Sequence, residues 1–244
     1  MKRREFIVTG STAAALMIST KTVSLMPLST MGESQLSDTN RLTPPTDGPI
    51  EVAFTISRGA TMIDFAGPWE VFQDVMLRNP KGGGSSRHPF RLYTVSDKAE
   101  PIVASGGMRI IPDYTFETAP APKVVVIPAQ SGSQALHAWL RKIVDSTDVT
   151  MSVCTGAFHL GRADLLSGKE ATTHHQFYDQ FARAFPDVKL KRGLRFVEGP
   201  KISTAGGLTS GIDLALRVVE RYFGRETAEQ TAIYMEYQSK GWIV

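Results

Sequence analysis

The sequence predicts a three-layer α/β sandwich of the flavodoxin-like type, with a mostly parallel sheet and helices on both faces. Two observations support this prediction. From residue 50 onward, short β-branched runs alternate with helical segments of ten or more residues, as parallel strands joined by helical crossovers do. In addition, the runs KVVVIPA and VTMSVC are apolar without a break, which is typical of strands buried on both faces of a parallel sheet.

The first half of this pattern contains two strands, a helix and a hairpin. Residues 50–57 (IEVAFTIS) and 90–96 (FRLYTVS) are predicted strands, because they are rich in β-branched and aromatic residues. Between them we expect a helix that Gly67-Pro68 opens and WEVFQDVML continues, since proline suits the first turn of a helix. Residues 101–116 hold two short extended pieces around a glycine pair, which indicates a hairpin.

The second half alternates strands with helices. Extended segments are predicted over 123–129, 149–154, 171–175 and 201–207. Helices are predicted over 133–146, 155–168, 176–185, 209–224 and 227–238. The first of these helices carries its apolar residues at helical spacing. With no internal repeat in 244 residues, we expect a single domain over residues 48–244.

Residues 1–47 have the pattern of an export signal followed by a flexible spacer. The basic start MKRREF leads into an apolar run that is shorter than a typical membrane span. Arg3-Arg4 resembles a twin-arginine signal, whose pathway exports folded proteins; an ordinary Sec-type leader is the alternative. No clean A-x-A site follows, so a retained membrane anchor also stays open. We expect a periplasmic protein that meets the membrane only through this signal.

The composition excludes several classes of function. The formal net charge is +3, and five of the 27 Lys and Arg residues lie within the first 44 residues, against three acidic ones. No basic stripe interleaved with aromatic residues is present, so we expect no nucleic-acid partner. The single cysteine excludes an internal disulfide and a cysteine-based zinc site. No His, Asp and Glu cluster has metal-ligand spacing, so no metal or other cofactor is expected.

That cysteine, Cys154, lies where a predicted strand meets a predicted helix. A sharp strand-to-helix turn is the geometry of a nucleophile elbow, and Ser152 and Gly156 supply small residues on either side. The N–H groups at the start of a helix stabilise a thiolate and lower the pKa of the thiol. They also stabilise an oxyanion, so Gly156 is a candidate for that site. The alternative is a buried cysteine that closes a core strand.

The stretch SVCTGAFHLGRADLLSGKEATTHH, with DFAGPWEVF upstream and TAGGLTSGIDLALRVVERYFG downstream, resembles the ThiJ/PfpI superfamily, and within it most closely the isonitrile hydratases. The resemblance extends over residues 50–237. It implies that Cys154 is a reactive nucleophile and that a carboxylate from the loop after the first strand approaches its sulfur. It also implies a homodimer, for which Trp242 is a candidate contact.

Asp64 occupies the position that matches the family's acid, in D-x-x-G-P. In an apolar pocket beside a thiol, the pKa of this carboxyl should rise, so that it can hold and donate a proton. The alternative is a carboxylate that caps the following helix. Peptidase-like members carry a histidine at the position of Thr155, whereas isonitrile hydratases carry a threonine there, as this chain does. The Thr155 hydroxyl is a candidate to orient substrate or water. An ordinary helix-opening threonine is the alternative.

Three further residues complete the predicted pocket. Many relatives carry Gly-Gly after the strand that this chain ends with Ala129-Gln130, and we expect the N–H of Ala129 or Gln130 to serve an oxyanion. His174, the first histidine of TTHH, is expected at the pocket rim. No carboxylate stands two residues after it, which argues against an amidotransferase triad. His159, one helical turn past the elbow, is expected to be structural.

The resemblance implies a cofactor-independent hydratase that converts a small isonitrile to an N-substituted formamide. Cys154 would attack the isonitrile carbon, Asp64 would protonate it, and water would then release the product. Two other classes stay open: another thiol chemistry on the same fold, such as a glyoxalase-like or peptidase reaction, and a non-enzymatic redox or ligand sensor.

Overall fold

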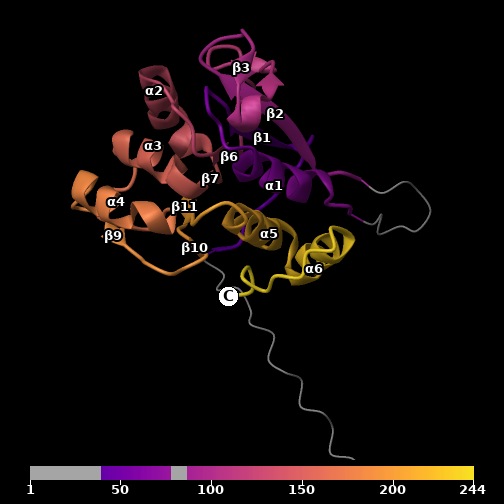
Figure 1. Cartoon of the computed structure of the whole chain (residues 1–244). Helices are drawn as coiled ribbons and strands as arrows, with labels where there is room; N and C mark the ends of the chain where they lie inside the picture. The colour runs from indigo at the N-terminus through magenta and orange to yellow at the C-terminus, as the bar shows by residue number, and fades with distance from the viewer. Residues whose placement is uncertain (1–39, 78–86) are drawn as a thin grey trace, which may run out of the picture. The chain divides into compact units, whose positions relative to one another are not determined.

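The computed structural model describes residues 40–77 and 87–244, and the expected export signal lies outside these residues. A seven-stranded sheet forms the centre, in the order β10-β11-β7-β6-β1-β2-β5 (Figure 1). Every pairing in it is parallel except that of β10 with β11. The strands are β1 (Ile50–Thr55), β2 (Phe90–Ser96), β5 (Tyr114–Thr115), β6 (Val124–Ile127), β7 (Val149–Ser152), β10 (Phe196–Val197) and β11 (Ile202–Ala205).

The α-helices are α1 (Met62–Gln73), α2 (Gln134–Ile143), α3 (Ala157–Arg162), α4 (Tyr178–Ala184), α5 (Ser210–Phe223) and α6 (Arg225–Tyr234). Short 3₁₀ turns are η2 (Ser105–Gly107), η3 (Val144–Ser146), η4 (Cys154–Gly156) and η5 (His175–Phe177). Two small ribbons accompany the sheet: β3 (Ile102–Val103) with β4 (Arg109–Ile110), and β8 (Glu170–Ala171) with β9 (Lys189–Leu190). The antiparallel β3–β4 pair confirms the predicted hairpin.

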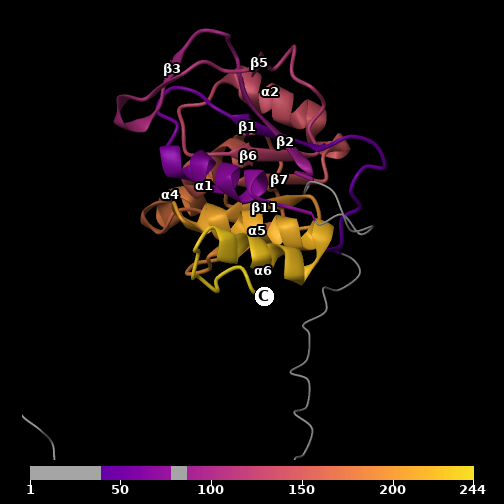
Figure 2. The same cartoon turned by 90° about the vertical axis from the view of Figure 1, so that its right-hand side faces the viewer.

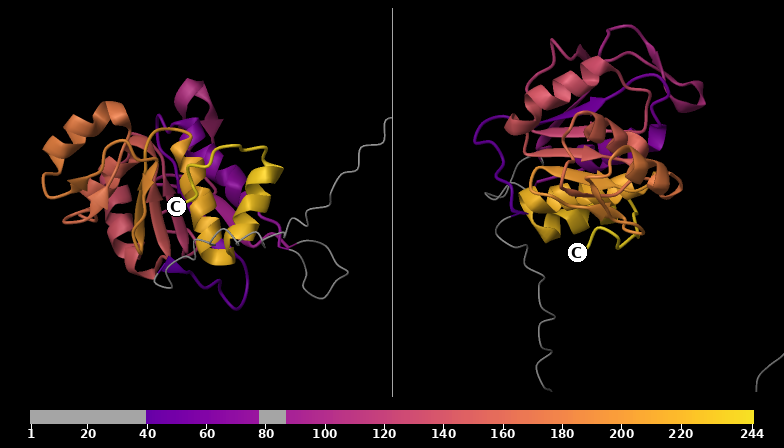
Figure 3. Two further views of the ribbon diagram at one scale, coloured as in Figure 1. Left: turned by 90° about the horizontal axis from the view of Figure 1, so that it is seen from below. Right: turned by 90° about the vertical axis from the view of Figure 1, so that its left-hand side faces the viewer.

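The sheet separates two hydrophobic cores, because neighbouring strand residues point to opposite faces. Val52 and Phe54 of β1 pack in one core with α1, α5 and α6, and Ala53 between them belongs to the other core with α2, α3 and α4. The two helical layers are visible on either side of the strands in Figures 2 and 3. This arrangement confirms the predicted three-layer α/β sandwich.

The strand order reverses between β1 and β6. From β1 the chain passes to β2 on one side and then returns to β6 on the other. In open α/β sheets, ligands bind outside the carboxyl ends of the strands near such a reversal. The segments that follow β1, β6, β7 and β11 therefore define the place for a site.

Helix α1 begins earlier than the sequence indicated. It starts at Met62, with Thr61 as its N-cap, and it contains Pro68 in its interior. The Gly-Pro pair does not open the helix; it serves the packing of α1 on α5. A Cβ atom on Gly67 would lie 2.8 Å from the Cγ1 atom of Ile212. Asp64 consequently lies in the first turn of a helix rather than in a loop.

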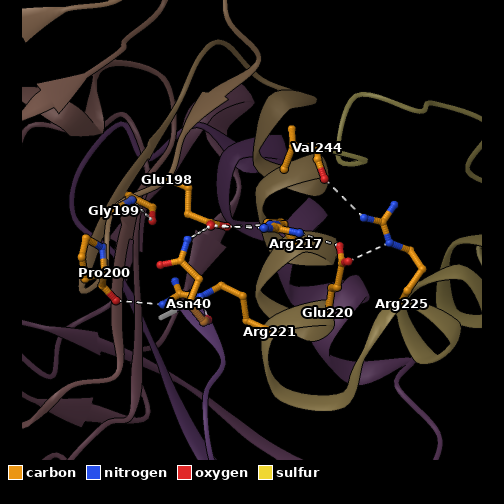
Figure 4. A network of polar contacts seen from close by, with 10 residues as sticks. Asn40, Glu198, Gly199, Pro200, Arg217, Glu220, Arg221, Arg225 and Val244 are labelled. Atoms are coloured by element: carbon orange, nitrogen blue, oxygen red, sulfur yellow. Dashed lines mark hydrogen bonds and ion pairs between the residues drawn. The ribbon is translucent and has the colours of Figure 1, made fainter. Parts of the chain in front are cut away.

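The folded part also begins earlier than the expected boundary at residue 48. The Asn40 side chain donates to Glu198 at 2.6 Å, and the Arg221 Nε atom donates to the Asn40 carbonyl at 2.8 Å (Figure 4). The Leu42 N–H donates to the Arg221 carbonyl at 2.9 Å. Within the same network, Arg217 forms an ion pair with Glu198. Residues 40–42 are thus bound to α5, and the spacer expected to reach residue 47 is shorter.

Trp242 does not lie on the surface, as a dimer contact would require. Its side chain is only 1% exposed and belongs to the core beneath α5 and α6. The Arg225 guanidinium lies 5.3 Å from the centre of its ring. The suggested role of Trp242 in dimerisation is therefore wrong.

Within residues 40–77 and 87–244, the helices are too short or too polar to cross a membrane.

Candidate active site

Cys154 follows β7 at a sharp turn, as the elbow hypothesis predicted. Its backbone has φ of 58°, a left-handed conformation that costs a side-chain-bearing residue about 1–2 kcal/mol. Two hydrogen bonds hold it there: the Cys154 N–H donates to the Gly206 carbonyl at 2.7 Å, and the Thr173 hydroxyl donates to the Cys154 carbonyl at 2.8 Å. Strain of this kind persists where the surroundings fix it, often at functional sites.

Gly156 makes room for this turn. A Cβ atom at position 156 would lie 2.1 Å from the Ile127 carbonyl oxygen at the end of β6, so only glycine fits. The Gly156 N–H donates to the Val153 carbonyl at 2.9 Å. Its donor is therefore engaged in the turn, and Gly156 shapes the elbow rather than facing an oxyanion.

The Cys154 side chain is 7% exposed and lies among three donors. The backbone N–H groups of Thr155 and Leu208 and the Thr155 side chain all hydrogen-bond with it and favour the thiolate. Burial and the charge of Asp64 outweigh them and raise the pKa of the thiol to about 11. The pKa of the thiol is thus raised and not lowered as the sequence indicated, because the sulfur is removed from solvent and lies beside the Asp64 carboxyl.

Asp64 is fully buried beside this sulfur. Burial raises the pKa of its carboxyl to about 7, while the Ala129 N–H and the Cys154 side chain act in the opposite direction. The Ala129 N–H donates to Oδ2 at 3.1 Å, and Oδ1 is buried without a hydrogen bond of ordinary geometry. The helix-capping alternative does not hold, since Thr61 is the N-cap and no side chain caps this helix end.

The two acids therefore form a coupled pair. Each resists ionisation because it is buried, and a charged Asp64 makes ionisation of Cys154 harder still. Near neutral pH the thiol therefore keeps its proton, and the carboxyl can both hold and release one. Such a carboxyl can accept the thiol proton as the sulfur attacks and can donate it afterwards.

The loop after β6 positions Asp64. The Ala129 N–H is engaged with the Asp64 carboxyl, and the Ala129 carbonyl accepts from the Thr61 N–H at 2.8 Å. Ala129 therefore holds the acid and does not offer a free oxyanion donor. The Gln130 N–H forms no hydrogen bond within the described part of the chain. The Gln130 side chain turns toward β1, where its Nε2 atom donates to the Thr55 hydroxyl at 2.9 Å.

Two buried histidines support the same loop. The His159 Nε2 atom lies 3.1 Å from the Gln130 carbonyl, and the His159 Nδ1 atom lies 3.1 Å from the His137 Nε2 atom. Because a carbonyl only accepts, His159 donates from Nε2, and neutral His159 accepts from His137 at Nδ1. Burial lowers the pKa of His159 to about 4. A Cβ atom on Gly132 would lie 2.2 Å from the His159 ring.

His174 lies next to the site through Gly207. A Cβ atom on Gly207 would be 2.3 Å from the His174 ring, which stacks on His175 at 4.4 Å between ring centres. The Gln176 N–H donates to the His174 Nδ1 atom at 3.3 Å. Burial lowers the pKa of His174, and the charge of the neighbouring His175 lowers it further. No described hydrogen bond joins His174 to Cys154 or Asp64.

Leu208 is the residue that sequence reasoning missed. Its N–H reaches the sulfur, and its backbone has φ of 52°. The signal was the Gly-Gly pair before it, because two small residues ahead of a helix allow a close backbone approach. Among the residues that the structure describes, no cluster of three or more His, Cys, Asp and Glu side chains is arranged to hold a metal ion.

The chain belongs to the DJ-1/PfpI family, whose model matches residues 50–221. A curated relative is the isonitrile hydratase of Pseudomonas putida, 28% identical over 195 residues that cover 77% of this chain and 78% of that protein. The transcriptional regulator CdhR of Pseudomonas aeruginosa is 32% identical over 149 residues, 59% of this chain. This chain spans 44% of CdhR and 49% of the regulator GbdR from the same species.

Solved structures show the same fold. A ThiJ/PfpI family protein from Pseudomonas syringae matches with a TM-score of 0.66 and 25% identity, over 89% of this chain and 85% of the other. Drosophila melanogaster DJ-1beta matches with a TM-score of 0.65 and 16% identity, over 79% of this chain and 100% of the other. The relatives thus include both an enzyme and transcriptional regulators.

Proposed function

We propose that this protein is a cofactor-independent hydratase that uses Cys154 to convert a small isonitrile to an N-substituted formamide. The observation that supports this most is the Asp64 carboxyl, which is buried beside the Cys154 sulfur and has a pKa of about 7. The reaction needs one group that takes a proton from sulfur and gives it to carbon, and a carboxyl with a pKa near neutrality does both. The 28% identity to an isonitrile hydratase supports the same substrate class.

In the first step, the Asp64 carboxylate takes the thiol proton while the Cys154 sulfur bonds to the terminal isonitrile carbon. Asp64 then gives this proton to the same carbon. The product is a thioimidate, in which that carbon carries the sulfur, one hydrogen and a double bond to nitrogen. The N–H groups of Thr155 and Leu208, which favour the thiolate, support the sulfur while it carries charge.

In the second step, Asp64 takes a proton from water as the water oxygen adds to the thioimidate carbon. The nitrogen receives this proton through Asp64. The carbon–sulfur bond then breaks, the hydroxyl proton returns to sulfur through Asp64, and the formamide leaves. One isonitrile and one water give one formamide, and both residues end as they began. The Thr155 hydroxyl, which hydrogen-bonds with the Cys154 side chain, would orient the water.

Turnover of isocyanoacetate and of its methyl ester tests the proposal, with the formyl proton of the product followed by NMR. We expect formamide from the native protein and at least a hundredfold loss in Cys154→Ala and in Asp64→Asn. Glu70→Gln is the matched control, because Glu70 is an exposed carboxylate on the same helix. No formamide from the native protein, or full activity in Asp64→Asn, would overturn the mechanism.

A ligand-binding module is the second candidate, because the similarity to CdhR and GbdR points to regulators. A module would bind an isonitrile or another small molecule without consuming it. Methylglyoxal consumption without formamide would instead favour glyoxalase-like thiol chemistry. A peptidase dyad has less support, since Thr155 stands where a histidine base is needed.

We further propose that the protein is periplasmic and forms a homodimer. The first proposal rests on the resemblance of Arg3-Arg4 to a twin-arginine signal, and the second on the family. Cell fractionation with an Arg3→Lys, Arg4→Lys variant tests export by the twin-arginine route. Light scattering on the purified protein tests the dimer.

A further inference from the structure

A small hollow opens beside the elbow, with a volume of about 190 Å³. Four of its lining residues have the spacing i, i+3, i+4 and i+7 of one helix face, namely Thr155, Phe158, His159 and Arg162. Residues of η5 and α4 close the opposite side. The lining residues that matter here are Gln130, Thr155, Phe158, His159, Arg162 and Gln180.

Arg162 contributes the charge of this hollow. Side chains on a helix lean toward its N-terminus, and the Arg162 guanidinium lies over the Phe158 ring at 5.7 Å from its centre. It therefore extends back along α3 toward the elbow. Its guanidinium forms no ion pair with any carboxylate of residues 40–77 and 87–244.

The other polar groups of the hollow carry no opposing charge. Gln130, Thr155 and Gln180 are neutral, and burial keeps His159 neutral by lowering its pKa to about 4. A guanidinium without an acidic partner in a small polar hollow is suited to a flat anion, because its fork of N–H groups matches a carboxylate.

The hollow also reaches the residue that follows the nucleophile in the chain. Thr155 lines it, and the Thr155 side chain hydrogen-bonds with the Cys154 side chain. Arg162 follows Thr155 by seven positions along η4 and α3, about 10 Å between their Cα atoms, and the Arg162 side chain covers part of that length. A molecule bound to both ends would carry its anion a few bonds away from its electrophilic carbon.

We propose that Arg162 binds a carboxylate of the substrate, so that the substrate is a short isocyano acid rather than a neutral isonitrile. The isonitrile group rests on the proposed function, whereas the carboxylate rests on the hollow and its arginine. Arg162 selects the substrate and takes no part in proton transfer.

Alkylation of Cys154 tests the carboxylate site without any turnover. Iodoacetate and iodoacetamide form the same thioether bond with loss of iodide, and they differ in one negative charge. We expect Arg162→Gln to lower the rate with iodoacetate about tenfold more than the rate with iodoacetamide. Arg183→Gln removes an equal exposed charge from α4 outside the hollow and should leave the ratio of the two rates as it is. Equal ratios in the native protein and both variants would overturn the proposal.

Turnover of isocyanoacetate and of its methyl ester then separates this proposal from the proposed function. Preference for the acid in kcat/KM, lost in Arg162→Gln mainly through a higher KM, supports both. Turnover of both compounds with no effect of Arg162→Gln on their ratio overturns the carboxylate site alone. No turnover of either compound, with an alkylation ratio that still depends on Arg162, overturns the isonitrile chemistry and keeps the anion site.

Discussion

Cys154 and Asp64 are two buried acids in contact: the charge of Asp64 raises the pKa of the thiol, whereas the hydrogen bond from Cys154 lowers the pKa of the carboxyl. The pKa of Asp64 is about 7 and that of Cys154 about 11. Burial is the largest cause of both raised pKa values. These two residues therefore determine the chemistry, because the Cys154 thiol keeps its proton until the neighbouring Asp64 carboxylate accepts it.

Replacing Asp64 with asparagine should make the thiol easier to ionise, although it should abolish turnover. The Asp64 charge raises the pKa of Cys154, and the amide carries no charge. We expect the pH midpoint of Cys154 alkylation by iodoacetamide to fall in Asp64→Asn, as measured by mass spectrometry over a pH series. Glu70→Gln serves again as the control and should not move the midpoint. A higher midpoint in Asp64→Asn would contradict the coupling.

The same substitution should stabilise the fold at alkaline pH. The folded-state pKa of Asp64 lies near 7 and its unfolded value near 3.8, so the folded state binds more protons between these values. Stability therefore falls as pH rises from about 4 to 7. We expect Asp64→Asn to unfold at higher urea concentration than the native protein at pH 8, and the difference to vanish near pH 4. A native protein that is more stable than the variant at pH 8 would refute this.

At the scale of elements, the site depends on how closely β6 approaches the elbow. The end of β6 lies against Gly156, and its following loop holds Asp64 through Ala129. The nucleophile and the acid are thus fixed by neighbouring strands of one sheet. The 3₁₀ turn that begins at Cys154 and the short helix α3 supply the Thr155 donor and one wall of the hollow.

Gly156→Ala should disrupt this contact. The new Cβ atom would lie 2.1 Å from the Ile127 carbonyl oxygen, which is backbone and cannot turn aside. We expect a loss of about 3 kcal/mol or more in the free energy of unfolding, measured with urea. Gly168→Ala is the matched control, because its Cβ atom meets nothing within 4 Å and only its φ of 71° is unfavourable, at about 1 kcal/mol. Similar losses in both variants would show that the close approach does not matter.

At the scale of the whole molecule, a buried charge network joins segments far apart in the chain. Arg217, Glu220 and Arg221 of α5 are all at least 94% buried, being 6%, 1% and 2% exposed. They connect Asn40, Glu198 and α6 through Arg225 (Figure 4). Buried charges of this kind are tolerated only when each keeps its partners.

A chain that begins at residue 48 should therefore be less stable than one that begins at residue 39. The shorter chain loses both Asn40 hydrogen bonds and the Leu42 N–H bond, and the Arg221 guanidinium loses a buried acceptor. We expect a decrease of about 2 kcal/mol or more in the free energy of unfolding, measured by urea denaturation. Asn40→Ala in the longer chain removes only the amide bond to Glu198 and should cost less. Equal stability of the two chains would place the boundary where the sequence suggested.

The sequence alone determined the features that neighbours in the chain control. Alternating strands and helices, the apolar strands of the central sheet, the elbow before Thr155 and the hairpin before residue 116 all follow from local pattern, because local sterics and periodicity select them. The resemblance of the motif around Cys154 also identified the superfamily to which the DJ-1/PfpI match belongs.

Only the tertiary structure decided what depends on contacts between distant segments. The start of α1 at Met62 reflects its packing on α5, and the raised pKa of Cys154 reflects burial and Asp64, ninety residues earlier in the chain. The burial of Trp242, the attachment of Asn40 and the donor from Leu208 are of the same kind. The burial of a side chain and the pKa of a group depend on all residues close to it in space, including those distant in the chain. The local pattern of a sequence does not specify those neighbours.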